Sequence, residues 1–262
     1  MDLDLTGKHA LVCGGSQGIG LAAAIELARL GADVTLLART PAKLDAAVAQ
    51  LPKTHDKQQH ATLAVDTGEL DALRAQIGGL AKRRPIHILV NNSGGPPPGT
   101  LASVTVDAFL DAYRRHLLAN HVLAESVIPG MKASGYGRIV NVISTSVKQP
   151  IPGLGVSNTT RGAVASWAKT LAAEVAPFGI TVNNVLPGST HTPRIEEIID
   201  TRAKASGKSR EEIYAAMTHE IPMARFAEAA EVGNAIAFLA SPAASYITGI
   251  NVPVDGGRTS SL

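Results

Sequence analysis

Short, nearly continuous apolar runs alternate along this chain with longer segments in which apolar residues recur at helical spacing. The runs predict strands at residues 9–13, 34–38, 61–65, 86–91, 138–143, 181–186 and 250–254. The longer segments predict helices at residues 19–30, 42–51, 70–82, 108–132 and 162–175. In the last of these the apolar residues fall three or four positions apart, as one face of a helix requires.

Strands that are apolar throughout and alternate with helices are typical of a parallel sheet with helices on both faces. We therefore expect an α/β fold, a single doubly wound, Rossmann-like domain over residues 1–262 with about seven strands. Start signals support two helices, because Thr40 precedes Pro41 and Ser209 precedes Glu212 in a capping-box pattern. Such sheets bind ligands beyond the carboxyl ends of their strands, so functional residues should follow each strand directly.

The composition excludes several classes of protein. With 24 Lys and Arg against 22 Asp and Glu, the net charge is only +2, and aromatic residues make up 3% of the chain. Nucleic-acid binding by phosphate neutralisation and base stacking would require a larger positive charge and more aromatic residues, so no nucleic-acid partner is expected. The single cysteine, Cys13, excludes an internal disulfide and any metal site built on several cysteines. No secretory signal and no apolar stretch of ~20 residues is present, so we expect a cytoplasmic protein with no membrane partner.

A glycine-rich turn follows the first predicted strand and leads directly into a helix. Its residues are Gly14, Ser16, Gln17, Gly18, Ile19 and Gly20. Such a turn points backbone N–H groups and a helix N-terminus at an anion, usually a pyrophosphate. The spacing G-x-x-x-G-x-G differs from the general fingerprint G-x-G-x-x-G, and glycines in a tight turn also occur for structural reasons alone. The position of the turn at the start of a β-α-β unit favours a dinucleotide site.

The end of the second predicted strand bears on the choice of dinucleotide. An acidic residue there binds the free ribose of NAD(H), whereas a basic residue accommodates the 2′-phosphate of NADP(H). In this chain Ala38 stands where the acid is expected, and Arg39 follows it. The sequence therefore predicts NADP(H) in preference to NAD(H). The alternative is that Arg39 is an ordinary solvated charge.

Three further segments follow predicted strands at the same edge of the sheet. They are Val65-Asp66-Thr67, Asn91-Asn92-Ser93-Gly94, and Pro187-Gly188 with Thr192. Together with the glycine turn, these motifs resemble the short-chain dehydrogenase/reductase family over nearly the whole chain. The end of the chain, residues 248–257, resembles that of β-ketoacyl-acyl-carrier-protein reductases in the same family.

The resemblance assigns cofactor-binding roles to these segments. Asp66 and Thr67 correspond to the adenine side of the site, although Asp66 could instead cap the next helix together with Glu69. The implied residues around the nicotinamide are Asn92, Ser93, Gly94, Pro187, Gly188 and Thr192.

The same resemblance fails at the reacting centre. The family's reaction uses a serine, a tyrosine thirteen residues later and a lysine four further on, with an asparagine on an earlier helix. The serine matches Ser144, but the next two positions hold Ser157 and Arg161. An ungapped count puts His116 at the asparagine position. The resemblance thus implies an active site at these four residues that lacks the usual tyrosine–lysine pair.

The loss of the tyrosine removes the usual proton donor. A phenol with a pKa of ~10 is acidified by a nearby ammonium and exchanges a proton with a carbonyl oxygen. The aliphatic hydroxyl of Ser157 is far less acidic, and the guanidinium of Arg161 stays protonated, so neither replaces the phenol. His116, with an ordinary pKa of ~6.5, is the best remaining candidate for the donor. The alternative is that His116 is a helix residue satisfied by hydrogen bonds.

We therefore expect an NADP(H)-binding, oxidoreductase-like protein that acts on a small-molecule carbonyl or alcohol through a divergent active site. The alternative is a catalytically silent module that binds NADP(H) or a small molecule for regulation, and a third possibility is a structural subunit beside an active relative. The resemblance also implies a homodimer or homotetramer. It further implies that a helical insertion at about residues 189–224 lies on the substrate side, although the mixed charges of this segment also suit a solvated flap.

Overall fold

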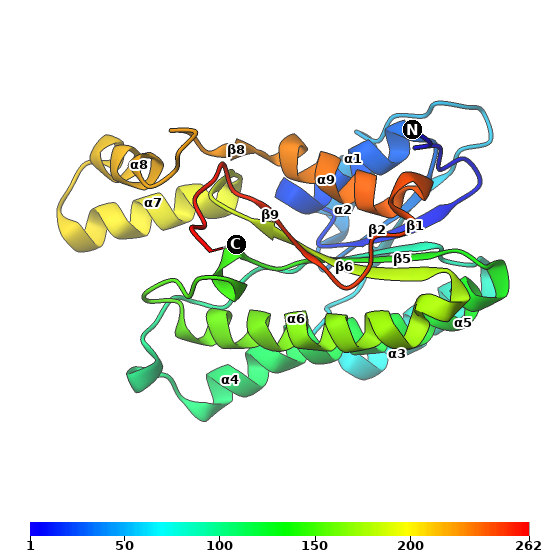
Figure 1. Ribbon diagram of the computed structural model, residues 1–262, viewed down its shortest axis with the longest axis horizontal. Coiled ribbons are helices and arrows are strands. Elements are labelled where there is room, and N and C mark those ends of the chain that lie inside the picture. The colour runs from blue at the N-terminus through cyan, green and yellow to red at the C-terminus, as the bar shows by residue number, and fades with distance from the viewer. Residues whose placement is uncertain (262) are drawn as a thin grey trace.

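The computed structural model describes residues 1–261. In this part of the chain, seven strands form one sheet in the order β3-β2-β1-β4-β5-β6-β9, and all neighbours are parallel (Figure 1). The strands are β1 (His9–Cys13), β2 (Asp33–Ala38), β3 (His60–Ala64), β4 (Ile88–Asn91), β5 (Gly137–Val142), β6 (Ile180–Pro187) and β9 (Asn251–Val254). The strand order reverses between β1 and β4, which makes the sheet doubly wound. The single-domain α/β fold predicted from the sequence is confirmed.

Helices cover both faces of the sheet (Figure 1). One face carries α1 (Gly18–Arg29), α2 (Pro41–Val48) and α9 (Ala229–Ala240), and the other carries α3 (Leu70–Arg83), α4 (Val106–Tyr113), α5 (Ala119–Ser134) and α6 (Gly155–Val175). Each layer buries its own apolar cluster against the strands. Full burial of a Leu, Ile or Val side chain stabilises a fold by about 1.5–3 kcal/mol. The inner strands lie between two such clusters, which explains why their sequences are apolar at nearly every position.

A row of asparagine side chains links four neighbouring strands. Asn91 on β4, Asn141 on β5, Asn184 on β6 and Asn251 on β9 are paired in register. The side-chain amide of each of the first three donates to the side-chain oxygen of the next, over 2.8, 2.9 and 2.8 Å. A slip of one residue would turn these amides to the opposite face and leave buried polar groups unpaired. The row therefore fixes the register of β4, β5, β6 and β9 relative to one another, and with it the positions of the segments that follow these strands.

Two helix boundaries differ from the sequence prediction in ways that matter for the site. The helix predicted at residues 108–132 consists of α4, a π-helical turn (Arg114–Leu118) and α5. The helix predicted from residue 162 begins earlier, at Gly155. The first turns of this helix are polar, so no apolar stripe in the sequence marks them. They nevertheless pack closely against Leu101, because a Cβ on Gly155 would lie 2.6 Å from Leu101 Cγ. Ser157 and Arg161 consequently lie one turn apart on the same helix.

The chain between β6 and α9 forms a projecting helical segment at the left of Figure 1. It contains α7 (Pro193–Ser206) and α8 (Arg210–His219), with a small sheet of β7 (Thr190–His191) and β8 (Ala227–Glu228). The segment has a small apolar cluster of its own around Phe226. The predicted capping box starts α8, because Ser209 and Glu212 each bond the other's backbone N–H. Thr40 precedes α2 as predicted, but its side chain makes no capping bond.

Short 3-10 turns at Leu101–Ser103, Thr145–Val147, Ala176–Phe178 and Pro242–Ala244 complete the described elements. Among the helices of residues 1–261, none combines the length and the apolar character needed to cross a membrane.

Candidate active site

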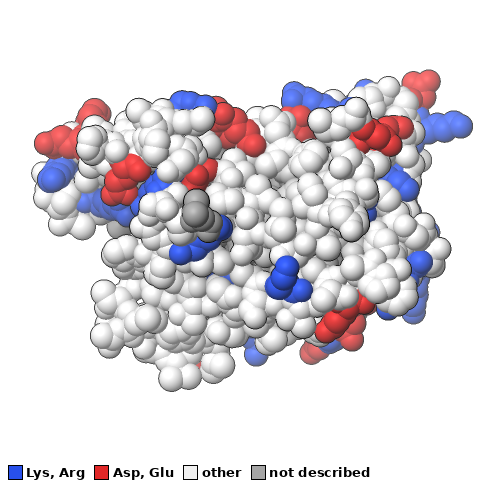
Figure 2. Space-filling view, viewed as in Figure 1, with Lys and Arg blue, Asp and Glu red and all other residues white. Residues whose placement is uncertain are grey.

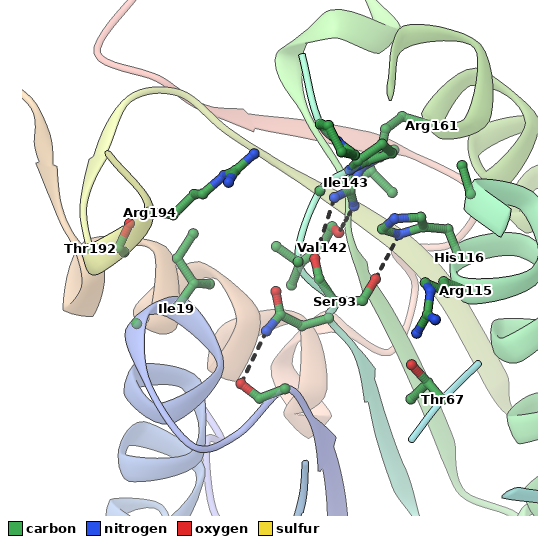
Figure 3. A pocket seen from close by; sticks show the side chains of 18 of the residues that line it. Ile19, Thr67, Ser93, Arg115, His116, Val142, Ile143, Arg161, Thr192 and Arg194 are labelled. Carbon is green, nitrogen blue, oxygen red and sulfur yellow. Dashed lines mark hydrogen bonds between the residues drawn. The ribbon is translucent and has the colours of Figure 1, made fainter. Parts of the chain in front are cut away.

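A cavity of about 1030 Å³ opens at the carboxyl edge of the sheet. The segments that follow β1, β2, β3, β4, β5 and β6 all contribute to its wall, together with α4, the π-helical turn, α6 and the start of α7. This is the edge at which a doubly wound sheet binds its ligands. Figure 3 shows the wall from close by, with Ile19 and Thr192 on one side and His116 and Arg161 on the other.

The glycine turn forms one part of this wall through Gly14, Ser16, Gln17, Gly18 and Ile19. Gly14 and Gly18 have φ angles of 59° and 56°, a left-handed conformation that glycine adopts without strain. Gly20 does not line the cavity but allows the turn to close on itself. A Cβ there would lie 2.2 Å from the backbone oxygen of Gly14, a distance that no real contact reaches. The turn leads into α1, so the N-terminus of that helix, where backbone N–H groups lack partners within the helix, borders the cavity as an anion site requires.

The next part of the wall lies beyond β2 and carries two basic side chains. Ala38, Arg39 and Thr40 line the cavity, and so does Lys43, in the first turn of α2. Lys43 was not predicted from the sequence. The signal was present, because Thr40-Pro41 marks the start of a helix and places Lys43 four residues after Arg39.

Asp66 and Thr67 line the cavity beyond β3. The carboxylate of Asp66 accepts hydrogen bonds from the backbone N–H of Gly68 at 2.8 Å and from Arg115 Nη1 at 3.0 Å. The alternative that Asp66 caps the next helix does not apply, since Glu69 occupies the N-cap position of α3. Arg115 is a second cavity residue that the sequence patterns did not reveal, and it also binds Asp111 at 2.9 Å.

The segments after β4 and β6 face each other across the cavity. All of the predicted residues Asn92, Ser93, Gly94, Pro187, Gly188 and Thr192 line it. The side chain of Asn92 donates to the backbone oxygen of Gly14 at 3.3 Å, which joins the β4 segment to the glycine turn. From α7, Arg194 extends into the same space (Figure 3), and it is the third basic residue absent from the sequence prediction.

His116 lies in the π-helical turn and is almost completely buried, with 3% of its surface exposed. Its Nδ1 is 2.7 Å from the hydroxyl of Ser93 (Figure 3). Burial, reinforced by the positive charges of Arg161 and Arg115, lowers the pKa of His116 to about 3. The imidazole is therefore uncharged at neutral pH. His116 is held by a hydrogen bond, which was one of the two alternatives for it, and it also lines the cavity.

Arg161 is buried on α6 and reaches the cavity wall next to His116. Its Nη1 donates to the backbone oxygen of Val142 at 2.7 Å, and its Nη2 to that of Ser93 at 3.5 Å (Figure 3). Nε has no hydrogen-bond partner within residues 1–261. Burial lowers the pKa of Arg161 to about 10, so the guanidinium remains charged at neutral pH. We call the wall formed by Ser93, His116, Val142, Ile143 and Arg161 the buried end of the cavity.

The two predicted serines are placed differently from His116 and Arg161. Ser144 ends the segment after β5 and Ser157 lies in the first turn of α6, but neither is among the residues that line the cavity. The Ser144 hydroxyl accepts a hydrogen bond from the backbone N–H of Ser146 at 3.1 Å. No tyrosine contributes to the cavity wall within residues 1–261. The same part of the chain contains no cluster of His, Cys, Asp or Glu that could hold a metal ion.

Fold and cavity together define a dinucleotide-binding protein of the doubly wound class. Comparison with known families narrows this class, because residues 14–259 match the family described as enoyl-(acyl carrier protein) reductase. The chain belongs to the short-chain dehydrogenase/reductase family of oxidoreductases. The resemblance noted in the sequence is thereby confirmed at the level of the family.

Individual relatives match along their whole length. The chain is 34% identical to an L-xylulose reductase of Bos taurus, over 98% of each protein. It is 32% identical to a 3-oxoacyl-acyl-carrier-protein reductase of Pseudomonas aeruginosa, over 97% of this chain and 98% of that one. A solved structure of L-sorbose reductase from Gluconobacter frateurii, in complex with NADPH and L-sorbose, superposes with a TM-score of 0.93, 31% identity and full coverage of both chains.

Proposed function

We propose that this protein is an NADPH-dependent oxidoreductase of a small molecule, and that its reacting centre lacks the usual tyrosine–lysine pair of the family. The observation that carries the proposal is one continuous cavity. At one end it has a glycine turn that fits a pyrophosphate, and at the other a buried guanidinium beside an uncharged imidazole. When bound, NADPH supplies a hydride to the substrate.

The residues present fit this dinucleotide. The glycine turn borders the cavity and leads into α1, so the N-terminus of that helix is available to phosphate oxygens, and its glycines let the turn pack tightly against Asn92 and Thr192. In the described wall beyond β2, no acidic side chain is placed to bind a free ribose, whereas Arg39 and Lys43 both face the cavity. NADP(H) was predicted from the sequence, and solved relatives that contain NADPH, L-sorbose reductase among them, agree with this prediction.

We expect NADPH to bind at least tenfold more tightly than NADH, and Lys43→Met and Arg39→Ala each to remove most of this preference. A hydrogen bond to a charged group contributes about 1.5–3 kcal/mol, which corresponds to roughly a 10- to 100-fold change in affinity. The affinity for NADH should stay nearly constant, because NADH has no 2′-phosphate. Fluorescence titration with both dinucleotides measures the effect.

Lys57→Met is the matched control, since Lys57 is exposed and lies outside the cavity. Equal affinities for the two dinucleotides in the native protein would contradict the assignment.

The proposed reacting centre consists of Arg161 and His116, with Ser144 and Ser157 at the positions that the family uses. His116 is uncharged at neutral pH and holds Ser93 in place, so it orients the wall rather than storing a proton. Arg161 keeps a positive charge next to the reacting atoms. The segment at residues 189–224 completes the mouth on the substrate side, because Arg194, Ile195 and Ile198 from α7 line the cavity.

The lack of a suitable proton donor among the described residues of the buried end also favours a second function, a sensor that binds NADPH without turnover. The two functions differ in stoichiometry. An oxidoreductase consumes many NADPH molecules per chain with a suitable acceptor, whereas a sensor binds one per chain and stops. Absorbance of NADPH across a panel of carbonyl and unsaturated acceptors, together with a binding titration, separates them.

We further propose that the protein forms homodimers or homotetramers. The strand β9 lies at an open edge of the sheet, and Tyr246 and Ile250 beside it are 102% and 40% exposed. Figure 2 shows that the centre of this face carries few charged residues, whereas acidic and basic residues gather over α7 and α8. An open strand edge with apolar neighbours is a favourable surface for association.

Light scattering should give a molecular mass at least twice that of the chain, and Ile250→Glu should reduce this mass because it places a charge at the proposed interface. A monomer in the native protein would contradict this proposal.

A further inference from the structure

Arg161 has hydrogen-bonding capacity that the described part of the chain does not use. The residue is 7% exposed, and its Nη1 donates to the backbone oxygen of Val142 at 2.7 Å. Nη2 reaches the backbone oxygen of Ser93 only at 3.5 Å, and within residues 1–261 Nε has no partner. A guanidinium carries five N–H groups, so most of its donors remain for a ligand.

No carboxylate among residues 1–261 neutralises this buried charge. The acidic residues of the described cavity wall are Asp66 and Asp111, and Arg115 binds both of them. None of the ion pairs formed within the same residues includes Arg161. A buried cation without a counter-ion is costly, and an anionic ligand removes this cost.

The negative charges of NADPH do not meet this need. They belong to its phosphates, which the proposed function places at the glycine turn and beside Arg39 and Lys43. The reduced nicotinamide and its ribose carry no charge. At the mouth, the side chain of Arg194 is 49% exposed and pairs with Glu197 at 3.4 Å. Of the basic residues in the described wall, Arg161 therefore has neither a carboxylate of the chain nor a proposed phosphate as its partner.

A proline-rich loop beside Arg161 forms an apolar part of the cavity wall. A Cβ on Gly95 would lie 3.9 Å from Arg161 Nη2, so the loop starts next to the guanidinium. Pro96–Pro98 continue the loop along the cavity, and proline has no backbone N–H to offer a ligand. Gly99 fixes the far end, because its N–H donates to the backbone oxygen of Gly153, just before α6, at 2.8 Å.

Other apolar side chains line the same cavity. They are Val104, Val156, Ile195 and Ile198. Burial of apolar surface against such side chains favours binding. The cavity is therefore suited to a ligand with an apolar body next to a negatively charged group.

We propose that the substrate is a small organic acid with an apolar body, and that Arg161 binds its carboxylate at the buried end of the cavity. This inference rests on the proposed function and names its substrate class. A guanidinium forms short, charge-assisted hydrogen bonds to a carboxylate. These bonds hold the acid in one orientation, so the group that exchanges hydride with NADPH has a fixed place.

The test compares organic acids with their primary amides, which have nearly the same shape and no charge. Benzoate, cyclohexanecarboxylate and 4-phenylbutanoate contain no group that NADPH reduces, so each can be titrated into the NADPH complex by calorimetry. The reduced nicotinamide is uncharged, so a preference for the acid reflects the protein. We expect the best-bound acid to bind at least about tenfold more tightly than its amide. Equal affinities, or no binding of any acid, would overturn the inference.

Acetate tests the contribution of the apolar body, because it carries the same carboxylate on a single methyl group. It should bind at least about tenfold more weakly than the best of the three larger acids, since it buries much less apolar surface. Acetate that binds as tightly as the larger acids would contradict an apolar body next to the carboxylate.

Arg161→Met should make the affinities of acid and amide nearly equal and leave the Kd for NADPH within about threefold of its native value. Arg161→Lys keeps a positive charge and should retain part of the preference, which keeps the assignment testable if the methionine variant does not fold. A preference that survives in Arg161→Met would contradict the role of Arg161. A larger rise in the Kd for NADPH would show that Arg161 binds the dinucleotide, and would overturn the inference as well.

Arg83→Met is the matched control for the removal of a positive charge. Arg83 is exposed at the end of α3 and does not line the cavity, so the preference for acids and the Kd for NADPH should both stay at native values. The same titrations separate this inference from the proposed function. If NADPH fails to bind to the native protein, the proposed function fails. If NADPH binds and acids bind no better than amides, the proposed function stands and the carboxylate site fails.

Discussion

Replacing Gly20 with alanine is expected to abolish NADPH binding in a protein that still folds. The new Cβ would lie 2.2 Å from the backbone oxygen of Gly14 and 2.7 Å from Asn92 Nδ2. Both atoms are held in place, because Asn92 bonds the same Gly14 oxygen. The turn has to open, and its backbone N–H groups then no longer converge on the pyrophosphate. Loss of two such bonds to a charged group corresponds to at least about a 100-fold increase in Kd.

Fluorescence titration of NADPH measures this effect, and circular dichroism checks that the variant is folded. Gly78→Ala is the matched control, because Gly78 lies in the interior of α3, where an added Cβ would meet no atom within 4 Å. That change should leave the Kd for NADPH unaltered. It should also stabilise the protein by about 0.5–1 kcal/mol, since glycine disfavours a helix interior. Native affinity in Gly20→Ala would show that the turn does not bind the dinucleotide as proposed.

The sheet could be predicted from the sequence because each inner strand is buried on both faces. Leu11–Cys13 is apolar at every position, so its sequence does not tell which side chain points to which face of the sheet. The same continuous apolar run is nevertheless enough to identify a strand that lies between two layers of helices. The exposed edge strand β3 was predicted one residue late, at 61–65 instead of His60–Ala64. Its residues are only partly buried, so the hydrophobic pattern defines its ends less sharply.

The position of the predicted cofactor residues at one cavity could be inferred for a topological reason. In a parallel sheet the residues that follow each strand meet at one edge, so Gly14, Asn92 and Pro187 converge there whatever the details of packing. Residues contributed by helices could not be located in this way. Lys43, Arg115 and Arg194 reach the cavity from α2, the π-helical turn and α7, whose orientation depends on tertiary contacts.

The proposed reacting centre shows more clearly that sequence patterns do not reveal tertiary contacts. The sequence identified His116 as a candidate proton donor from its ordinary pKa, but the burial that lowers this pKa to about 3 depends on the surrounding fold. The hydrogen bond between His116 and Ser93 joins residues from separate elements, and no local pattern signals it. Spacing likewise placed Ser157 one turn before Arg161, yet of the two only Arg161 has a side chain long enough to reach the cavity wall from α6.

If the reacting centre is as proposed, introducing the family's tyrosine and lysine, with Ser157→Tyr and Arg161→Lys together, is expected to raise the rate of reduction of saturated carbonyls by about 100-fold or more. Ser157 lies in the first turn of α6 next to Val156, which already lines the cavity, so a longer side chain at position 157 can extend toward the buried end. The lysine one turn later would acidify the phenol. General acid catalysis contributes roughly 10²–10⁴-fold, which sets the size of the gain. The rate of NADPH oxidation with the 3-oxobutanoyl thioester of N-acetylcysteamine measures this gain.

The pH dependence and a phenylalanine control separate an added proton donor from a reshaped cavity. The gained rate should fall as pH rises through the pKa of the new phenol, because only the protonated form donates. The control, Ser157→Phe with Arg161→Lys, has nearly the same shape but no hydroxyl, so it should show no gain. An equal gain in the phenylalanine variant would mean that filling the cavity matters more than the acid. No gain in the tyrosine variant, with NADPH still bound, would mean that these two substitutions are not sufficient and that other residues of the wall around His116 also prevent carbonyl reduction.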